Sequence, residues 1–216
     1  MNLLIALGAH AKLEKSSPLN TALVYWFTYA EPIYEYLGIH LTMAEDMPFV
    51  YIARFGCNYL RPLCKIGIEM ISESDSQYNN PGVQKAFFGH YPAGVSLYQW
   101  KYMHKMIQFP NDFLDFDWGE QGNIEKYGQK EPRIIDFNLV KKAGVPIAMI
   151  AGKHDTIVYP VDTHWVRDHL GSALIEYFET NGGHTLFFLG EDMTWVQSHV
   201  LKWMKEHNPL PKAGWF

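Results

Sequence analysis

Several features that would place a protein in a broad class are missing from this chain of 216 residues. No apolar run approaches the roughly 18 residues that a membrane-spanning helix needs, and no Asn-x-Ser/Thr glycosylation sequon occurs. The formal net charge is −5 and the isoelectric point is near 6.0, which gives no electrostatic reason for nucleic acid binding. We therefore expect no spanning helix and no nucleic acid partner.

Cysteine is scarce as well, because the chain has only Cys57 and Cys64. Their spacing matches neither the C-x-x-C of redox motifs nor that of zinc sites. Two alternatives stay open from the residues alone, a disulfide closing a short loop or two buried thiols. His154, His164 and His169 are near one another in sequence, but the spacing of the last two does not place both on one helix face. We expect no metal site, and no cofactor is implied.

Apolar residues, by contrast, are plentiful: 48% of the chain is hydrophobic and 15% is aromatic. This is enough for a core, and the length fits one ordinary domain. The apolar run from Met1 to Leu7 has no basic residue before it and is too short for the hydrophobic region of a signal peptide. We interpret Leu3 to Leu7 as a buried strand.

The segment from Ser17 to Met70 is rich in aromatic residues and is interrupted by proline. Because proline is tolerated in the first turn of a helix but not in its interior, the pattern predicts helices of about ten residues and no sheet. The polar stretch from Ser72 to Pro81 predicts a loop. A further helix is expected from Leu97 to Ile107, whereas residues 115–119 and 121–133 look irregular.

From Val145 onward, predicted strands alternate with predicted helices. The strand Pro146 to Ala151 is followed by a helix from Val161 to Leu170, which a glycine would end at position 171. A strand from Ala173 to Glu179 and a last helix from about Asp192 to His207 follow, with Met193 among the apolar residues at helical spacing. This alternation predicts an α/β fold of parallel strands with covering helices.

Asp155 and His184 are the most informative pair in the chain, because each follows one of these last two strands. This is the chain order of the second and third members of a Ser-Asp-His triad in α/β-hydrolases. A carboxylate fixes the tautomer of the histidine, which in turn takes the proton of the serine hydroxyl. Taken singly, such an aspartate is often a helix N-cap and such a histidine an ordinary surface residue. Their joint occurrence favours a catalytic origin.

The serine member of the triad is missing. No G-x-S-x-G occurs, and the nearest approach, Gly94-Val95-Ser96-Leu97-Tyr98, lacks the second glycine and a strand leading into it. With an acid and a base only, no acyl-enzyme can form.

A longer set of residues extends the pattern. It comprises His90-Tyr91-Pro92-Ala93-Gly94-Val95-Ser96, Trp100, Phe116-Asp117-Trp118-Gly119, Asn123, Tyr127, Pro132, Val145-Pro146 and Gly152-x-x-Asp155. Together with the interval from Asp155 to His184, it resembles the acid lipase family of α/β-hydrolases, the gastric and lysosomal acid lipases. The resemblance covers nearly the whole chain and is most specific from Pro92 to Gly119.

The resemblance implies the C-terminal half of an α/β-hydrolase fold that carries a mainly helical cap or lid. Residues 1–11 would hold a core strand, residues 12–84 the cap, residues 85–144 the connection from cap to core, and residues 145–216 the C-terminal core with acid and histidine. In the family the serine elbow and the oxyanion-hole loop precede the strand matched by Leu3 to Leu7, so we expect both to be missing. Secretion or a lysosomal location is also implied.

Three further positions gain a meaning from the resemblance. Cys57 and Cys64 fall where the family has a disulfide within the cap, although the interval between them differs. Family members commonly carry an aspartate four residues after the triad acid and another two residues after the histidine. This chain has Tyr159 and Leu186 at those positions, and neither is the acid or the base.

The first functional hypothesis is the C-terminal portion of a lipase-like carboxylic-ester hydrolase, a serine esterase acting on triacylglycerols or sterol esters. Asp155 would orient His184, which would act as general base and then general acid for a serine outside the chain. The isolated chain would be inactive, because nucleophile and oxyanion hole each supply orders of magnitude in rate. The alternative is a catalytically inactive, hydrolase-derived binding or structural subunit. A third hypothesis makes Ser96 a relocated nucleophile.

The partners that follow are a lipid ester substrate and either the missing N-terminal half or a protein that covers the free edge of the strand Leu3 to Leu7. An open lid would present aromatic side chains to acyl chains or to a lipid interface. The same side chains could instead pack the cap onto the core. The aromatics in question are Trp26, Phe27, Phe49 and Phe55.

Overall fold

The structure is a computed structural model, of which we describe residues 1–44, 48–91 and 93–208. For Phe49, Ala53 and Lys85 the description covers the backbone only. Pro92 of the sequence motif, and the side chain of Phe49 expected in the lid, lie outside the described part.

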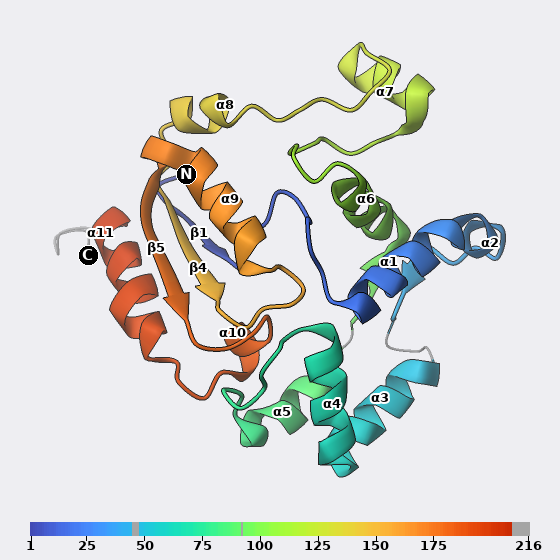
Figure 1. Cartoon of the computed structure of the whole chain (residues 1–216), viewed down its shortest axis with the longest axis vertical. Coiled ribbons are helices and arrows are strands. Elements are labelled where there is room, and N and C mark those ends of the chain that lie inside the picture. The colour runs from blue at the N-terminus through green and yellow to red at the C-terminus, as the bar shows by residue number, and fades with distance from the viewer. Residues whose placement is uncertain (45–47, 92, 209–216) are drawn as a thin grey trace, which may run out of the picture.

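Three parallel strands form the main sheet in the order β1-β4-β5 (Figure 1). They are β1 (Leu4–Leu7), β4 (Ile147–Gly152) and β5 (Leu174–Thr180), each beginning one residue later than the sequence predicts. All residues of β4 are buried, as expected for a central parallel strand covered on both faces. The fold class is α/β, as predicted, and the architecture is that of part of an α/β-hydrolase fold.

Helices cover the two faces of this sheet. Successive side chains of a strand point to opposite faces, and β4 follows this rule. Met149 packs against α9 (Pro160–Leu170) on one face, and Ile150 packs against Trp203 of α11 (Lys202–His207) on the other. As expected, α9 ends at a glycine with positive φ, Gly171. Both apolar faces of the central strand are thus buried.

The last helical segment differs from the predicted helix over residues 192–207. The side chain of Asp192 accepts a hydrogen bond from the backbone N–H of Thr194, at 2.9 Å, so the helix begins after Asp192. Met193 therefore precedes the helix instead of lying on its apolar face. The next turns form a π-helix, η2 (Val196–Leu201), before α11 begins. A π-helical turn shifts the spacing that a 3.6-residue period assumes.

The rest of the described chain is mainly helical, as predicted, and proline occupies the first turn of α1, α2 and α4. The expectation of no sheet is wrong at one place, because β2 (Leu41–Thr42) and β3 (Val95–Ser96) pair as short antiparallel strands. The helices are α1 (Pro18–Tyr29), α2 (Glu31–Tyr36), α3 (Pro48–Tyr59), α4 (Arg61–Ile71), α5 (Pro81–Phe88), α6 (Leu97–Gln108), α7 (Gly119–Tyr127), α8 (Phe137–Lys142) and α10 (Leu186–Leu189).

The helix α7 corrects the expectation that residues 121–133 are irregular. The buried side chain of Asn123 accepts a hydrogen bond from the backbone N–H of Trp118 and donates to Asp117 and to the carbonyl of Lys130. Gly128, at φ 73°, then ends the helix. One buried amide thus organises a segment whose composition is typical of a loop.

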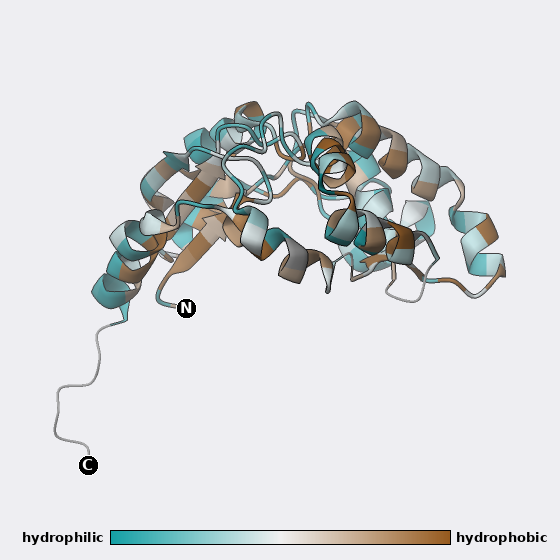
Figure 2. Ribbon diagram, turned by 90° about the horizontal axis from the view of Figure 1, so that it is seen from below, coloured by the Kyte–Doolittle hydropathy of each residue, from teal (hydrophilic) through white to brown (hydrophobic). Residues whose placement is uncertain are grey.

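Two groups of helices lie beyond the sheet (Figure 1). In one, α1 packs on α6, and in the other α3, α4 and α5 pack together around Cys64 and Ile68. Viewed from below in Figure 2, the elements form an arch with the sheet toward one end. Among the described helices, none is both long and apolar enough to cross a bilayer.

Candidate active site

Asp155 lies in the loop between β4 and α9 and is only 2% exposed. Its Oδ1 accepts hydrogen bonds from the backbone N–H groups of Ile157 and Val158, at 2.9 and 2.8 Å. These two bonds hold the carboxylate in one rotamer. They leave the second oxygen, Oδ2, directed toward another partner.

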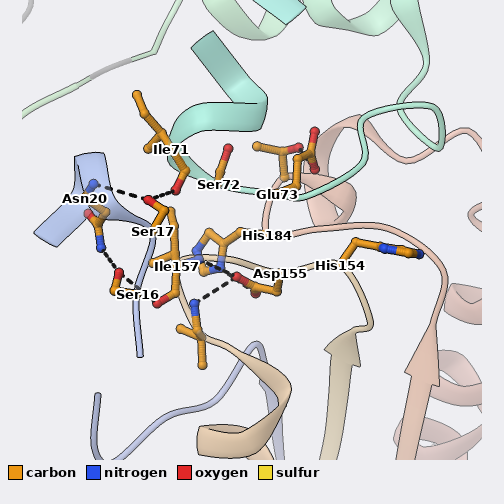
Figure 3. A network of polar contacts seen from close by, with 12 residues as sticks. Ser16, Ser17, Asn20, Ile71, Ser72, Glu73, His154, Asp155, Ile157 and His184 are labelled. Atoms are coloured by element: carbon orange, nitrogen blue, oxygen red, sulfur yellow. Dashed lines mark hydrogen bonds and ion pairs between the residues drawn. The ribbon is translucent and has the colours of Figure 1, made fainter. Parts of the chain in front are cut away.

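That partner is His184, in the loop that follows β5. Its ring nitrogen Nδ1 lies 2.9 Å from Oδ2 of Asp155 (Figure 3). The two loops meet because β4 and β5 are adjacent parallel strands, whose carboxyl ends share one edge of the sheet. The sequence predicts this placement. A carboxylate on Nδ1 favours the tautomer with the proton there, which leaves Nε2 able to accept one.

Glycines allow the chain to close tightly around this pair. A Cβ on Gly152 would lie 2.6 Å from the carbonyl oxygen of Gly182, so any larger residue would push the two loops apart. A Cβ on Gly8, just after β1, would lie 3.6 Å from Cε1 of His184 and 3.7 Å from Oδ2 of Asp155. The ends of all three strands therefore surround the pair.

A third wall comes from the segment between α4 and α5, which we call the 72–80 segment. Its first carbonyl, that of Ser72, accepts hydrogen bonds from the backbone N–H groups of His184, at 3.1 Å, and Thr156, at 3.3 Å. The backbone N–H of Ser74 donates to the carbonyl of His154 at 2.8 Å. A segment predicted as a polar loop is thus tied to both loops of the candidate site.

The hydroxyl groups of Ser96 and Ser17 both have structural hydrogen-bond partners. The hydroxyl of Ser96 accepts a hydrogen bond from the backbone N–H of Gln99, so Ser96 caps α6, and it lies on β3 in the smaller sheet. The hydroxyl of Ser17 donates to the carbonyl of Ile71 and accepts from the backbone N–H of Asn20 (Figure 3). The hypothesis that Ser96 replaces the missing nucleophile is therefore not supported by its position.

The cysteines of the helical part are bonded to each other, and its aromatic side chains are partly exposed and partly buried. Cys57 and Cys64 form a disulfide that joins α3 to α4. Trp26 and Phe55 are 64% and 58% exposed. Phe27 follows the packing alternative, because its ring is buried against Trp100 at a centroid distance of 4.9 Å.

The three clustered histidines have separate roles. His154 stacks on Tyr78, His164 contacts the carboxylate of Glu179, and His169 stacks on Trp165. Within residues 1–44, 48–91 and 93–208, no group of three or more metal-binding side chains is arranged around a common point.

The sequence does not single out every titratable residue at the site. Glu73, in the 72–80 segment, is fully buried and pairs through its backbone with Asp155 in a short antiparallel bridge. Its neighbours in sequence are serines and an aspartate, so composition alone marks an exposed loop. In the sequence, only the abrupt change from an apolar helix to polar residues marks this position. Such a change does not indicate what the polar residues pack against.

No protein-family model matches the chain. Two curated proteins, both named lipase member N, are similar to it. The mouse protein (Mus musculus) is 27% identical over 157 residues, which is 70% of this chain and 38% of the relative. The human protein (Homo sapiens) is 26% identical over 150 residues, or 68% of this chain and 36% of the relative. The chain thus spans a little over a third of the length of these relatives, and it is similar to lipases at low identity.

Proposed function

We propose that this chain supplies the acid and the base of a lipase-like carboxylic-ester hydrolase of the Ser-His-Asp type. The observation that carries the proposal is the 2.9 Å contact between Oδ2 of Asp155 and Nδ1 of His184 at the carboxyl ends of adjacent parallel strands. The similarity to lipases supports the reaction class.

In the proposed reaction Asp155 keeps the proton of His184 on Nδ1 and stabilises the imidazolium that forms. The other nitrogen, Nε2, takes the proton of a serine hydroxyl as the serine attacks the ester carbonyl, and then delivers it to the departing alkoxide. Water then attacks the acyl-enzyme. His184 takes a proton from the water and delivers it to the serine oxygen, and the carboxylic acid is released. The serine and the oxyanion donors would come from outside these 216 residues, because the sequence has no G-x-S-x-G.

The free side of β1 supports a further part of the proposal. Within the main sheet β1 pairs only with β4, and Leu4 and Leu7 remain 42% and 45% exposed. In stable proteins, an edge strand with exposed leucines is usually covered by another segment of the chain or by a partner protein. We propose that the nucleophile-bearing part of the hydrolase, or a protein partner, covers it.

The substrate class is proposed from the helical part. The disulfide-linked helices α3 and α4 expose a set of large apolar side chains, as a lid over acyl chains or against a lipid interface would. A triacylglycerol or a sterol ester fits this surface. The exposed residues are Tyr51, Ile52, Phe55, Tyr59, Leu60, Leu63, Ile66 and Met70.

The test compares two polypeptides with a short-chain nitrophenyl ester. We expect no turnover by the purified chain, and turnover by a longer product that includes an in-frame G-x-S-x-G encoded upstream of Met1. In the longer product, His184→Ala should abolish turnover and Asp155→Asn should lower kcat by about four orders of magnitude, as loss of the triad acid does in serine proteases. His207→Ala, on α11, is the matched control and should leave kcat unchanged.

Two results would contradict the proposal. If no G-x-S-x-G is encoded upstream and no product turns over ester, the chain is better explained as an inactive binding or structural subunit. Turnover by the 216-residue chain itself, abolished by Ser96→Ala, would instead assign the nucleophile to Ser96.

A further inference from the structure

Glu73 is an unusual residue for its surroundings, because a fully buried carboxyl group is rare unless it is paired or has a function. Within the described part of the chain, its carboxylate accepts hydrogen bonds from two neutral donors and forms no ion pair with a cation. Oε2 accepts a hydrogen bond from the hydroxyl of Thr185 at 2.8 Å, and Oε1 accepts from the side-chain amide of Asn79. Burial raises the pKa of Glu73, the two hydrogen bonds oppose the rise, and the nearby charge of Asp155 adds to it.

The two ends of this residue contact the two loops of the candidate site. Through its backbone, Glu73 forms an antiparallel bridge with Asp155, the proposed acid. Through its side chain, it binds Thr185, the residue directly after the proposed base, His184. Figure 3 shows Glu73 beside His184, Asp155 and His154. A single residue therefore spans the acid loop and the base loop.

The second donor closes the arrangement. Asn79, at the other end of the 72–80 segment, donates to Glu73 and lies 3.2 Å from the hydroxyl of Thr185. Asn79 also forms a backbone bridge with Gly190, the residue that directly follows α10. The carboxylate, the amide and the hydroxyl thus form a closed polar triangle at Thr185, the residue directly after the histidine.

From this geometry we propose that Glu73 is a positioning residue, which fixes the histidine loop relative to the acid loop and so sets the distance between Asp155 and His184. The inference rests on the proposed function for its catalytic meaning, but not for its structural content. The two loops belong to different strands, and the separation of their side chains depends on contacts between the loops. Distances in such a pair matter, because hydrogen-bond strength falls steeply with misalignment.

A purely structural buried carboxyl exists elsewhere in the chain and provides a matched control. Asp162 is equally buried, and burial likewise raises its pKa. Its oxygens accept from the backbone N–H groups of Glu14 and Lys15, and none of its described hydrogen bonds is to the histidine loop. Replacing either carboxyl should reduce stability. Only the replacement of Glu73 should disturb His184.

The experiment uses NMR on the isotope-labelled chain, with two readouts at the site. The first is the low-field resonance of the proton on Nδ1 of His184, which reports its bond to Asp155. The second is hydrogen exchange of the backbone N–H of His184, which is bonded to Ser72. Exchange at Met149, in the buried strand β4, measures global stability in the same sample.

For Glu73→Ala and Thr185→Val we expect the low-field resonance to weaken or vanish, and exchange at His184 to accelerate about tenfold or more relative to Met149, as loss of a hydrogen bond to a charged group would give. Glu73→Gln, which can still accept from Thr185, should retain most of both signals. Asp162→Asn should change exchange at His184 and Met149 by the same factor.

The outcomes separate this inference from the proposed function. If both readouts in Glu73→Ala follow global stability, as in Asp162→Asn, the positioning role is wrong even if the longer product hydrolyses esters. If the wild-type chain lacks the low-field resonance, the dyad and the proposed function are in question. Selective acceleration of His184 exchange in Glu73→Ala and Thr185→Val would still support the positioning role of Glu73 in that case, and its absence would overturn that role.

Discussion

Replacement of Gly183 by alanine is the sharpest test of how the 72–80 segment meets the histidine loop. Gly183 is buried, and its backbone has no positive φ that would itself penalise alanine. A Cβ at this position would lie 1.9 Å from Cβ of Glu73 and 3.0 Å from its Cα. Real carbon atoms do not approach so closely, and the positions of Cβ and Cα of Glu73 are fixed by its backbone, so one of the two segments must move.

Two estimates of the destabilisation agree. Inserting a methyl group into a packed site costs about 1–3 kcal/mol. If the 72–80 segment moves away instead, three backbone hydrogen bonds are weakened, those of His184 and Thr156 to Ser72 and that of Ser74 to His154. At about 1 kcal/mol net for each bond, this second route costs about 3 kcal/mol. We therefore expect a loss of about 2–3 kcal/mol, or a fall in Tm of roughly 5–10 °C for a domain of this size.

A helical glycine gives a control of opposite sign. A Cβ on Gly67, within α4, would meet nothing within 4 Å. Gly67→Ala should therefore stabilise the protein by about 0.5–1 kcal/mol through helix propensity. Urea and thermal denaturation followed by circular dichroism would measure both variants. If Gly183→Ala is as stable as the wild type, or gains stability as Gly67→Ala does, the 72–80 segment does not pack on the histidine loop and the reasoning is refuted.

Three further predictions concern charge and covalent links. Burial raises the pKa of Glu73, so its contribution favours the folded state at acid pH and is lost as pH rises through the raised pKa; the unfolding free energy of Glu73→Gln relative to the wild type should increase as the pH rises above about 4.3, the ordinary pKa of a glutamate. The hydrogen bond from Trp203 lowers the pKa of Glu176, so its contribution is present above about pH 4.3 and lost as pH falls; Glu176→Gln should lose stability at neutral pH and little in acid, and equal pH dependence in the two variants would contradict both assignments. Reduction of the Cys57–Cys64 disulfide, which closes a seven-residue interval, should lower the unfolding free energy by about 2 kcal/mol; an unchanged urea midpoint in Cys57→Ser/Cys64→Ser would show that the link constrains nothing.

The parts of the fold that the sequence predicts are those that local physics decides. An apolar run ending in glycine predicts β4 to within one residue, because a buried parallel strand needs a continuous apolar stretch. Prolines predict where α1 and α4 begin, because only the first helical turn tolerates a residue without an N–H. The meeting of Asp155 and His184 then follows from topology, since adjacent parallel strands end at the same edge.

The parts that the sequence does not predict depend on partners distant along the chain. The helix α7 needs the amide of Asn123, which bridges residues on both sides of it. The short pairing of β2 with β3 joins residues more than fifty positions apart, and its two-residue strands carry no periodicity to detect. The π-helix η2 keeps apolar side chains on the core through a change of hydrogen-bond register that a fixed period cannot represent.

The 72–80 segment also depends on partners distant along the chain, although its polar composition is typical of an exposed loop. Its composition predicts exposure, yet Ser72, Glu73, Ser76 and Asn79 are buried. Polar side chains can be buried when their hydrogen bonds are satisfied, and here each has a partner: Ser72 with the carbonyl of Ile68, Glu73 and Asn79 with Thr185, and Ser76 with Glu69. Such a set could not form in an isolated loop, because Thr185 belongs to the last part of the chain. The backbone of the segment makes the hydrogen bonds to both candidate catalytic loops, and its buried side chains are satisfied by polar partners such as Thr185 and Glu69.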